Sequence, residues 1–181
     1  DGEVVLGPHR LLREDLDALP LPAYDLFPMD KYVGHTHWKP FVEMMTSRGC
    51  PSACTFCYEW DQYDPRSPMD FLKWRAKSPE RVIEELELLH KKFGTKVVVI
   101  QDDNFNVNPE RVKKFCKLKR EKHNPIKWVS LGRAVDWVNC EQILPLMKET
   151  GLFMGVFGIE VTTPEELKKI AKGITIEHIK K

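Results

Sequence analysis

The segment from Val42 to Cys57 reads VEMMTSRGCPSACTFC and joins an apolar run to three closely spaced cysteines. The apolar part predicts a β-strand over Val42–Ser47. Cys50, Cys54 and Cys57 follow directly, with the spacing CxxxCxxC. In a parallel βα fold, the loops after the strands carry the functional side chains. The sequence therefore predicts a metal-binding loop at the end of the first strand.

Beyond this loop, short apolar runs alternate with amphipathic stretches, which is the pattern of βα units on a parallel sheet. Further strands are predicted over Lys96–Ile100, Lys127–Leu131 and Phe153–Ile159. A closed barrel of eight units takes roughly 250 residues, so this chain is too short for one. The predicted fold class is α/β, as a partial (β/α) barrel with an extended N-terminal linker.

The helices between the strands are predicted from their first residues. Three starts place a capping residue before a proline and an acid: Ser78-Pro79-Glu80, Asn108-Pro109-Glu110 and Thr163-Pro164-Glu165. Asn139, with Gln142 three residues later, imitates a capping box and predicts one more start. The predicted stops are Gly94, Gly151 and Gly173. The apolar phase of the second helix runs through Val112, Phe115, Cys116 and Lys119.

The composition of the 181 residues is 42% hydrophobic and 30% charged, with a formal net charge of +1. This balance gives no electrostatic indication of nucleic-acid or membrane binding. No apolar stretch reaches the ~18 residues of a membrane span, and the first residues lack a signal-peptide pattern. Three of the five cysteines lie within one short loop, which does not fit a disulfide framework. We expect a cytoplasmic protein in a reducing compartment.

The three loop cysteines leave one position of a metal site open, because iron–sulfur clusters and structural zinc ions normally take four ligands. Cys116 falls on the core side of its predicted helix and Cys140 at a predicted helix start, so neither is an evident fourth ligand. Two interpretations remain. A further ligand completes an iron–sulfur site, or the loop belongs to a zinc-binding module or a non-enzymatic electron carrier.

The loop resembles that of the radical S-adenosylmethionine (SAM) superfamily in its cysteine spacing and in the aromatic residues Phe56 and Tyr58. The likeness covers roughly residues 42–180. It implies a 4Fe-4S cluster on the three cysteines, with SAM bound at the open iron. It also implies that Phe56 is the aromatic residue before the third cysteine, and that the backbone at Tyr58 meets the adenine.

Gly158-Ile159-Glu160 closes the last predicted strand. In similar enzymes the glutamate of this GIE pattern hydrogen-bonds the ribose hydroxyls of SAM, a task that suits a carboxylate. The resemblance thus implies SAM-binding roles for Gly158 and Glu160. The alternative is a solvated glutamate at a strand end.

Asp102 and Asp103 follow the second strand, where the family often has a Gly-Gly-Glu motif that binds the SAM amino group. The sequence departs from that motif. Either aspartate could accept a hydrogen bond from an ammonium group or could cap the next turn. Arg133 follows the third strand and has the charge and geometry to bind the SAM carboxylate. Its alternative role is a surface salt bridge.

Residues 1–40 are rich in proline and aromatic residues and show no sustained period. The part Leu16–Asp25, LDALPLPAYD, is similar to the linker between the cobalamin-binding and radical SAM domains of the cobalamin-dependent branch. We therefore expect an interdomain linker over 1–40 and a radical SAM core over 41–181. The chain has no DxHxxG motif for the cobalamin tail and starts without methionine. We expect a segment of a longer protein, with cobalamin bound on a domain outside it.

The resemblance implies reductive cleavage of SAM to methionine and a 5′-deoxyadenosyl radical, which takes hydrogen from an unactivated carbon. The cobalamin branch, with its methyltransferases and anaerobic porphyrin-ring cyclase, implies methylation or ring formation. The implied partners are a small-molecule substrate and a one-electron donor such as a flavodoxin or ferredoxin. A methylthiotransferase-like enzyme is the alternative within the superfamily, but it would carry extra cysteines or an RNA-binding domain.

Overall fold

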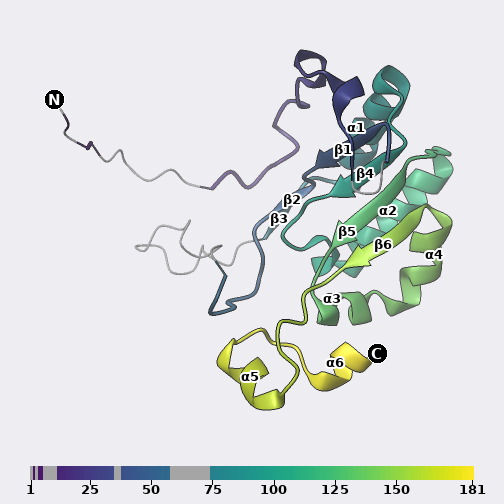
Figure 1. Cartoon of the computed structure of the whole chain (residues 1–181). Helices are drawn as coiled ribbons and strands as arrows, with labels where there is room; N and C mark the ends of the chain where they lie inside the picture. The colour runs from purple at the N-terminus through teal and green to yellow at the C-terminus, as the bar shows by residue number, and fades with distance from the viewer. Residues whose placement is uncertain (1, 3, 6–11, 35–37, 58–73) are drawn as a thin grey trace.

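A four-stranded parallel sheet, in the order β1-β4-β5-β6, forms the centre of the protein (Figure 1). The structure is a computed structural model that describes residues 2, 4–5, 12–34, 38–57 and 74–181. The strands of the sheet are β1 Phe41–Met44, β4 Val97–Ile100, β5 Lys127–Leu131 and β6 Leu152–Val156. A separate antiparallel pair consists of β2 Ser47–Arg48 and β3 Arg75–Ala76.

Helices connect the strands and cover one face of the sheet. The described α-helices are α1 Pro79–Phe93, α2 Pro109–Glu121, α3 Ala134–Asn139, α4 Leu144–Glu149, α5 Pro164–Lys169 and α6 Ile176–Lys180. Single 3-10 turns are η1 Tyr24–Leu26, η2 Met29–Lys31, η5 Phe105–Val107 and η6 Glu141–Ile143. α1, α2 and α4 pack on the sheet, whereas α5 and α6 lie beyond its end, with α6 in contact with α3 (Figure 1). No helix in the described part of the chain is long and apolar enough to cross a membrane.

The main core lies between the sheet and its covering helices. Trp128 of β5 is fully buried there, and its ring meets Phe105 and Phe115 edge-on, with centroids 5.6 and 5.3 Å apart. Such aromatic contacts add to the hydrophobic gain from burying large apolar surfaces. The core therefore fixes the relative positions of the strands, and with them the loops at the strand ends.

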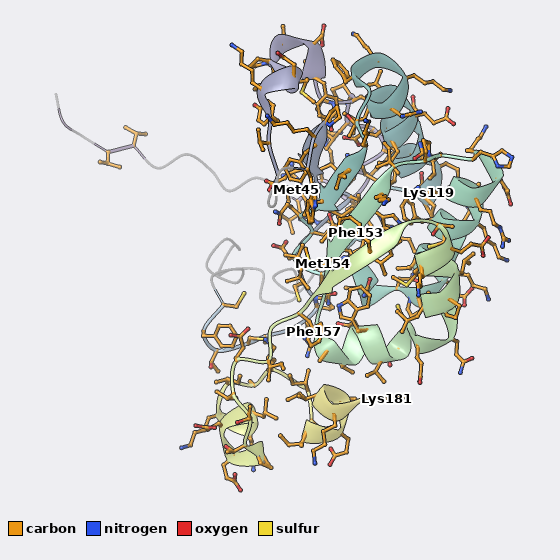
Figure 2. All side chains as sticks on the ribbon, turned by 45° about the vertical axis from the view of Figure 1, so that its right-hand side comes forward. Met45, Lys119, Phe153, Met154, Phe157 and Lys181 are labelled. Carbon is orange, nitrogen blue, oxygen red and sulfur yellow. The ribbon has the colours of Figure 1, made fainter. Side chains whose placement is uncertain are left out.

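The edge strand β6 and the residue that follows it leave large apolar side chains partly exposed. Phe153, Met154 and Phe157 are 43%, 40% and 47% exposed (Figure 2). Phe153 also meets Trp38 edge-on, with ring centroids 4.9 Å apart, and Trp38 packs near Phe41. Trp38 thereby covers part of the sheet face opposite the helices, near the strand starts.

The α/β fold with a parallel sheet is confirmed, and so are most element positions. The strand predicted over Lys127–Leu131 is confirmed at both ends, and the ends of the other predicted strands differ from the structure by at most three residues. The predicted proline starts are confirmed at α1, α2 and α5, where Ser78, Asn108 and Thr163 accept hydrogen bonds from the backbone of the first turn.

The predicted helix start at Asn139 is wrong. Asn139 is the last residue of α3, and no side chain caps the following elements η6 and α4. Pro145 lies in the first turn of α4. Proline cannot donate a backbone hydrogen bond and its ring clashes with the preceding turn, so one helix ends and another begins before it.

The predicted stop at Gly173 is also displaced, because α5 already ends at Lys169. Ala171 and Gly173 have φ angles of 48° and 66°, so the chain turns through left-handed backbone between α5 and α6. Thr175 and His178 then form a capping box for α6, a helix that the sequence patterns did not predict.

The proline-rich segment is less extended than predicted. Leu16 and Tyr24 are buried against the core. Tyr24 Oη donates to Glu85 Oε1 of α1 at 2.5 Å, and Lys77 Nζ pairs with Glu85 Oε2 at 2.6 Å. Burial and the neighbouring Glu85 carboxylate raise the pKa of Tyr24. The described part of this segment around Tyr24 is therefore anchored on α1.

Candidate functional site

Two aspartates after β4 hold the loop that carries the cysteines. Asp102 is 1% exposed. Its Oδ1 accepts from Thr46 N at 2.5 Å, and its Oδ2 accepts from the hydroxyls of Thr46 and Ser47 at 2.5 and 2.6 Å. Burial raises the pKa of this carboxyl group, and the hydrogen bonds oppose that rise. Asp102 thus fixes the start of the cysteine loop, a role that differs both from contact with SAM and from capping the next turn.

Asp103 is partly exposed and acts further along the loop. Its Oδ2 accepts a hydrogen bond from Gly49 N at 3.1 Å. Gly49 has a φ of 80°, a left-handed conformation that glycine adopts without steric cost. Of the two adjacent aspartates, Asp103 is the one whose side chain a ligand can reach.

The three cysteines follow as free thiols, with Cys54 buried and Cys50 and Cys57 partly exposed. Cys57 N donates to Cys54 O at 3.0 Å, which closes a tight turn. Burial raises the pKa of both Cys50 and Cys54. The positive charge of Arg133 acts in the opposite direction on both thiols.

The donor set fits an iron–sulfur cluster in kind, because three thiols lie on one short loop. Cys54 raises the pKa of Cys50, and Cys57 raises that of Cys54, each by less than burial does, so neighbouring thiols of the loop lie near one another. Within the described residues, however, no three His, Cys, Asp or Glu side chains already stand together as a metal site. The donors are therefore present on one loop, but they do not stand in the geometry of a formed metal site.

Glu160 follows β6 in an unusual backbone conformation, with a φ of 68°. Its side chain is 44% exposed, and its Oε1 accepts from Lys172 Nζ at 2.9 Å. A methyl group at Gly158 would collide with the Glu160 carboxylate and lie 3.1 Å from Lys172 Nζ. The GIE pattern thus places an exposed carboxylate over a glycine that leaves room for it.

Lys172 is the site residue that sequence reasoning missed. Its side chain is 7% exposed, and its Nζ lies 5.4 Å from the centroid of the Phe56 ring in addition to its bond with Glu160. The ring is itself 55% exposed. The sequence signal is weak, since a Lys-Gly pair after a short helix suggests only a turn. Lys172 nevertheless links the cysteine loop to the end of β6.

Arg133 lies beside this group and caps no helix with its side chain, although it precedes α3. Its Nη2 donates to the backbone oxygen of Lys172, and its Nη1 lies 3.8 Å from Asp136 Oδ2. The structure therefore places Arg133 at the cysteine loop, partly engaged with protein groups. Tyr58 lies outside the described residues.

Cys116 and Cys140 lie away from the loop, and both are 0% exposed. Burial raises the pKa of Cys116 to about 11 and that of Cys140 to about 12. Both thiols belong to the hydrophobic core between the sheet and its helices, apart from the loop cysteines. That neither supplies a fourth ligand stays a prediction, which the cluster-loading experiment below addresses.

Known proteins resemble this chain along most of its length. The sequence profile of the Radical SAM superfamily matches residues 44–181. An uncharacterized methyltransferase of Pyrococcus horikoshii is 40% identical over 175 residues, which are 97% of this chain and 36% of that protein. The anaerobic magnesium-protoporphyrin IX monomethyl ester cyclase of Rubrivivax gelatinosus is 26% identical over 181 residues, covering 100% of this chain and 31% of the cyclase. The chain thus spans about a third of the length of these relatives.

A solved structure agrees with the fold. The cobalamin-dependent S-adenosylmethionine radical enzyme OxsB, with aqua-cobalamin and S-adenosylmethionine bound, matches with a TM-score of 0.60 at 23% identity. The match covers 75% of this chain and 20% of that one, and at such identity it shows the fold alone. The profile match, the 40% identical relative and the CxxxCxxC loop after β1 agree. The chain belongs to the radical SAM superfamily.

Proposed function

We propose that this chain binds the 4Fe-4S cluster and SAM in a radical SAM enzyme of the cobalamin-dependent methyltransferase or cyclase type. The observation that carries the proposal is the meeting of two separate motifs. The cysteine loop after β1 and the GIE glutamate after β6 lie at the same end of the sheet, and Lys172 contacts Phe56 of one and Glu160 of the other. A cysteine loop or a glutamate at a strand end could each occur without the other, so their proximity supports a shared site.

Each residue of the site has a task that suits its chemistry. The thiolates of Cys50, Cys54 and Cys57 hold the cluster, and the exposed carboxylate of Glu160 accepts hydrogen bonds from the ribose hydroxyls. When bound, the cluster and SAM supply the reductive cleavage of a sulfur–carbon bond and the radical that takes hydrogen from the substrate. The protein binds and orients these groups and keeps water away from them.

Asp103 and Arg133 complete the proposed SAM site with opposite charges. Asp103 is exposed enough to accept a hydrogen bond from the SAM ammonium group, and Arg133 is suited to the SAM carboxylate. Arg133 is 16% exposed and already contacts Asp136 and Lys172. Its binding to a ligand would therefore require it to share or exchange those contacts.

Cobalamin is suggested by the structural neighbour OxsB, which is named as cobalamin-dependent, and the reaction type by the curated relatives. The electron donor follows only from the resemblance to the family. The names of the similar proteins include methyltransferases and a porphyrin-ring cyclase. We place cobalamin on a domain outside residues 1–181, and we propose a small-molecule substrate and a flavodoxin or ferredoxin as one-electron donor. Cobalt analysis of the purified full-length protein tests the cobalamin assignment directly.

Anaerobic reconstitution of the full-length protein tests the cluster. Single changes of Cys50, Cys54 or Cys57 to Ala should abolish loading of iron and sulfide, whereas Cys116→Ala should load normally. SAM added to the reduced wild-type protein should change the electron paramagnetic resonance spectrum of the cluster. A zinc-binding module or an electron carrier would show no response to SAM, and a requirement for Cys116 would contradict the three-ligand site.

Glu160→Ala tests the SAM site separately. Losing hydrogen bonds to a ligand typically costs ~1–3 kcal/mol, so SAM affinity should fall about ten- to a hundredfold while the cluster spectrum is retained. Equilibrium dialysis under anaerobic conditions measures this affinity. If the variant bound SAM as the wild type does, Glu160 would be a solvated residue at a strand end.

A further inference from the structure

Lys172 is a buried lysine, with its side chain 7% exposed. Burying an ammonium group is costly unless it is paired. Lys172 Nζ has two such partners, Glu160 Oε1 at 2.9 Å and the Phe56 ring at 5.4 Å. Both partners belong to the candidate site, and they come from loops that are about a hundred residues apart in the sequence. The lysine therefore joins two parts of the site that the strands alone do not connect.

The turn around Lys172 is also tied to its surroundings. Thr55 N of the cysteine loop donates to Ile170 O at 3.0 Å, and Arg133 donates to the backbone oxygen of Lys172. Ala171 and Gly173 are exposed and left-handed, whereas Lys172 between them is buried. This backbone directs the lysine side chain inward.

The ion pair leaves the carboxylate accessible. The side chain of Glu160 is 44% exposed although Oε1 accepts from Lys172, so a ligand can reach the group that the lysine orients. Glu160 also stands in a left-handed conformation that a non-glycine residue adopts only at a cost. The hydrogen bond from Lys172 to Oε1 holds the Glu160 side chain in one direction.

We propose that Lys172 is a positioning residue that orients the Glu160 carboxylate and ties it, through Phe56, to the cysteine loop. Ordering of the loop on its cluster and binding of a ligand at Glu160 then favour each other, because a coupling between two sites acts in both directions. This inference rests on the proposed function for the identity of the two ligands, but the tether itself is a property of the protein alone.

The first test needs no cofactor. Hydrogen exchange is measured by mass spectrometry on the cofactor-free full-length protein, for the wild type, K172M, K172R and K169M. Lys169 is an exposed lysine three residues away and serves as the matched control. In K172M, peptides covering residues 50–57 should exchange at least about threefold faster, with K172R close to the wild type and K169M unchanged. Peptides covering β4 should not change.

Two outcomes of this exchange experiment would overturn the inference. Unchanged exchange over residues 50–57 in K172M would mean that the lysine does not hold the loop. Faster exchange throughout the protein, β4 included, would mean that Lys172 is a general structural residue and not a positioning one.

The second test is a double-mutant cycle on the cluster-loaded protein, with SAM affinity as the readout. K172M and E160A should each weaken SAM binding by about tenfold, and E160A should cost less than about threefold when K172M is already present. K172R should restore most of the affinity. Independent losses, which would multiply to about a hundredfold in the double variant, would refute the coupling. If the wild type bound no SAM, the proposed function would fail. The exchange experiment would still show whether Lys172 holds the cysteine loop.

Discussion

Lys119 in the helix-covered core and Lys172 at the strand ends are both almost fully buried, but their surroundings differ. Lys119 is 2% exposed, and its Nζ donates to the backbone oxygen of Asn124 at 2.6 Å (Figure 2). Burial lowers its pKa to about 8. Lys172 instead faces a carboxylate and an aromatic ring. In the core, burial lowers the pKa of a lysine, whereas at the strand ends the charge of a lysine holds a second group.

The construction of the two regions explains this difference. The core consists of side chains from long helices and central strands that pack against one another. The strand-end region consists of short turns, which are held by side-chain and backbone hydrogen bonds and contain left-handed residues. We expect changes of buried residues to alter the free energy of unfolding, and changes of exposed residues at the strand ends to alter ligand binding more than stability.

Trp128→Ala should have the largest effect. Trp128 is 0% exposed and packs against Phe105 and Phe115, so its loss leaves a large cavity. The free energy of unfolding should fall by about 3–5 kcal/mol, as is typical of Trp-to-Ala changes in cores. Urea denaturation followed by circular dichroism measures it. A loss below about 1 kcal/mol would mean that the core does not dominate stability.

Lys119→Met should raise the free energy of unfolding, in contrast to Trp128→Ala, and the size of this gain should depend on pH. The folded-state pKa of about 8 lies below the usual value of 10.5, so between these values the unfolded chain binds more protons than the native one. The stability of the wild type should therefore rise from pH 8 toward 10.5. Below pH 8 the folded protein bears the full cost of burying the charged lysine, which is about 3 kcal/mol at most.

The variant has no such penalty, so it should be more stable than the wild type at pH 7 and should lose this advantage as the pH rises. The comparison between the two proteins from pH 7 to 9 cancels the titration of other groups. Parallel pH profiles for the two proteins would show that Lys119 is not a buried charge at neutral pH.

Asp102→Ala should destabilise the protein more than Asp103→Ala, although the residues are adjacent. The first change leaves the buried donors of Thr46 and Ser47 without an acceptor, at a cost of about 1–3 kcal/mol. Asp103 accepts one hydrogen bond at a partly exposed position, so its loss should cost below about 1 kcal/mol. Urea denaturation measures the free energy of unfolding of both variants. Equal losses would contradict the assignment of Asp102 to loop support and of Asp103 to the ligand site.

Gly158→Ala should change stability least. The backbone φ of Gly158 is not left-handed, so alanine fits the main chain, and the free energy of unfolding should change by less than about 1 kcal/mol. The added methyl group would instead displace the Glu160 carboxylate and disturb Lys172. SAM affinity should fall several-fold in equilibrium dialysis, and an unchanged affinity would show that this direction of the carboxylate is not needed.

Local patterns were sufficient for much of the fold. The proline starts at Pro79, Pro109 and Pro164 combine a cap, a fixed φ and an acid, all of which act within one turn, and each is confirmed. Even the burial of Lys119 follows from its phase in α2. The start predicted at Asn139 failed because Pro145, six residues later, divides the segment into two helices.

The sequence indicates candidate site residues only where a short motif carries the signal. The cysteines and Glu160 stand in short motifs, whereas Lys172 gains its meaning from partners that the sheet brings to it from distant parts of the chain. Asp102 and Asp103 looked equivalent because consecutive side chains take opposite directions at a strand end, which the sequence does not reveal without the register. Long-range pairing is therefore what sequence reasoning lacked.

Because Glu160 has a left-handed backbone, thermal stability and ligand binding place opposite demands on this position. At a φ of 68°, glycine would have less steric strain than glutamate. Replacing a strained residue by one that fits typically raises the free energy of unfolding by on the order of 1 kcal/mol. A selection for thermal resistance alone would thus favour Gly at position 160 and remove the carboxylate in the same step. Engineering campaigns on this protein should screen for ligand binding alongside heat tolerance, because at this residue the two properties are expected to move apart.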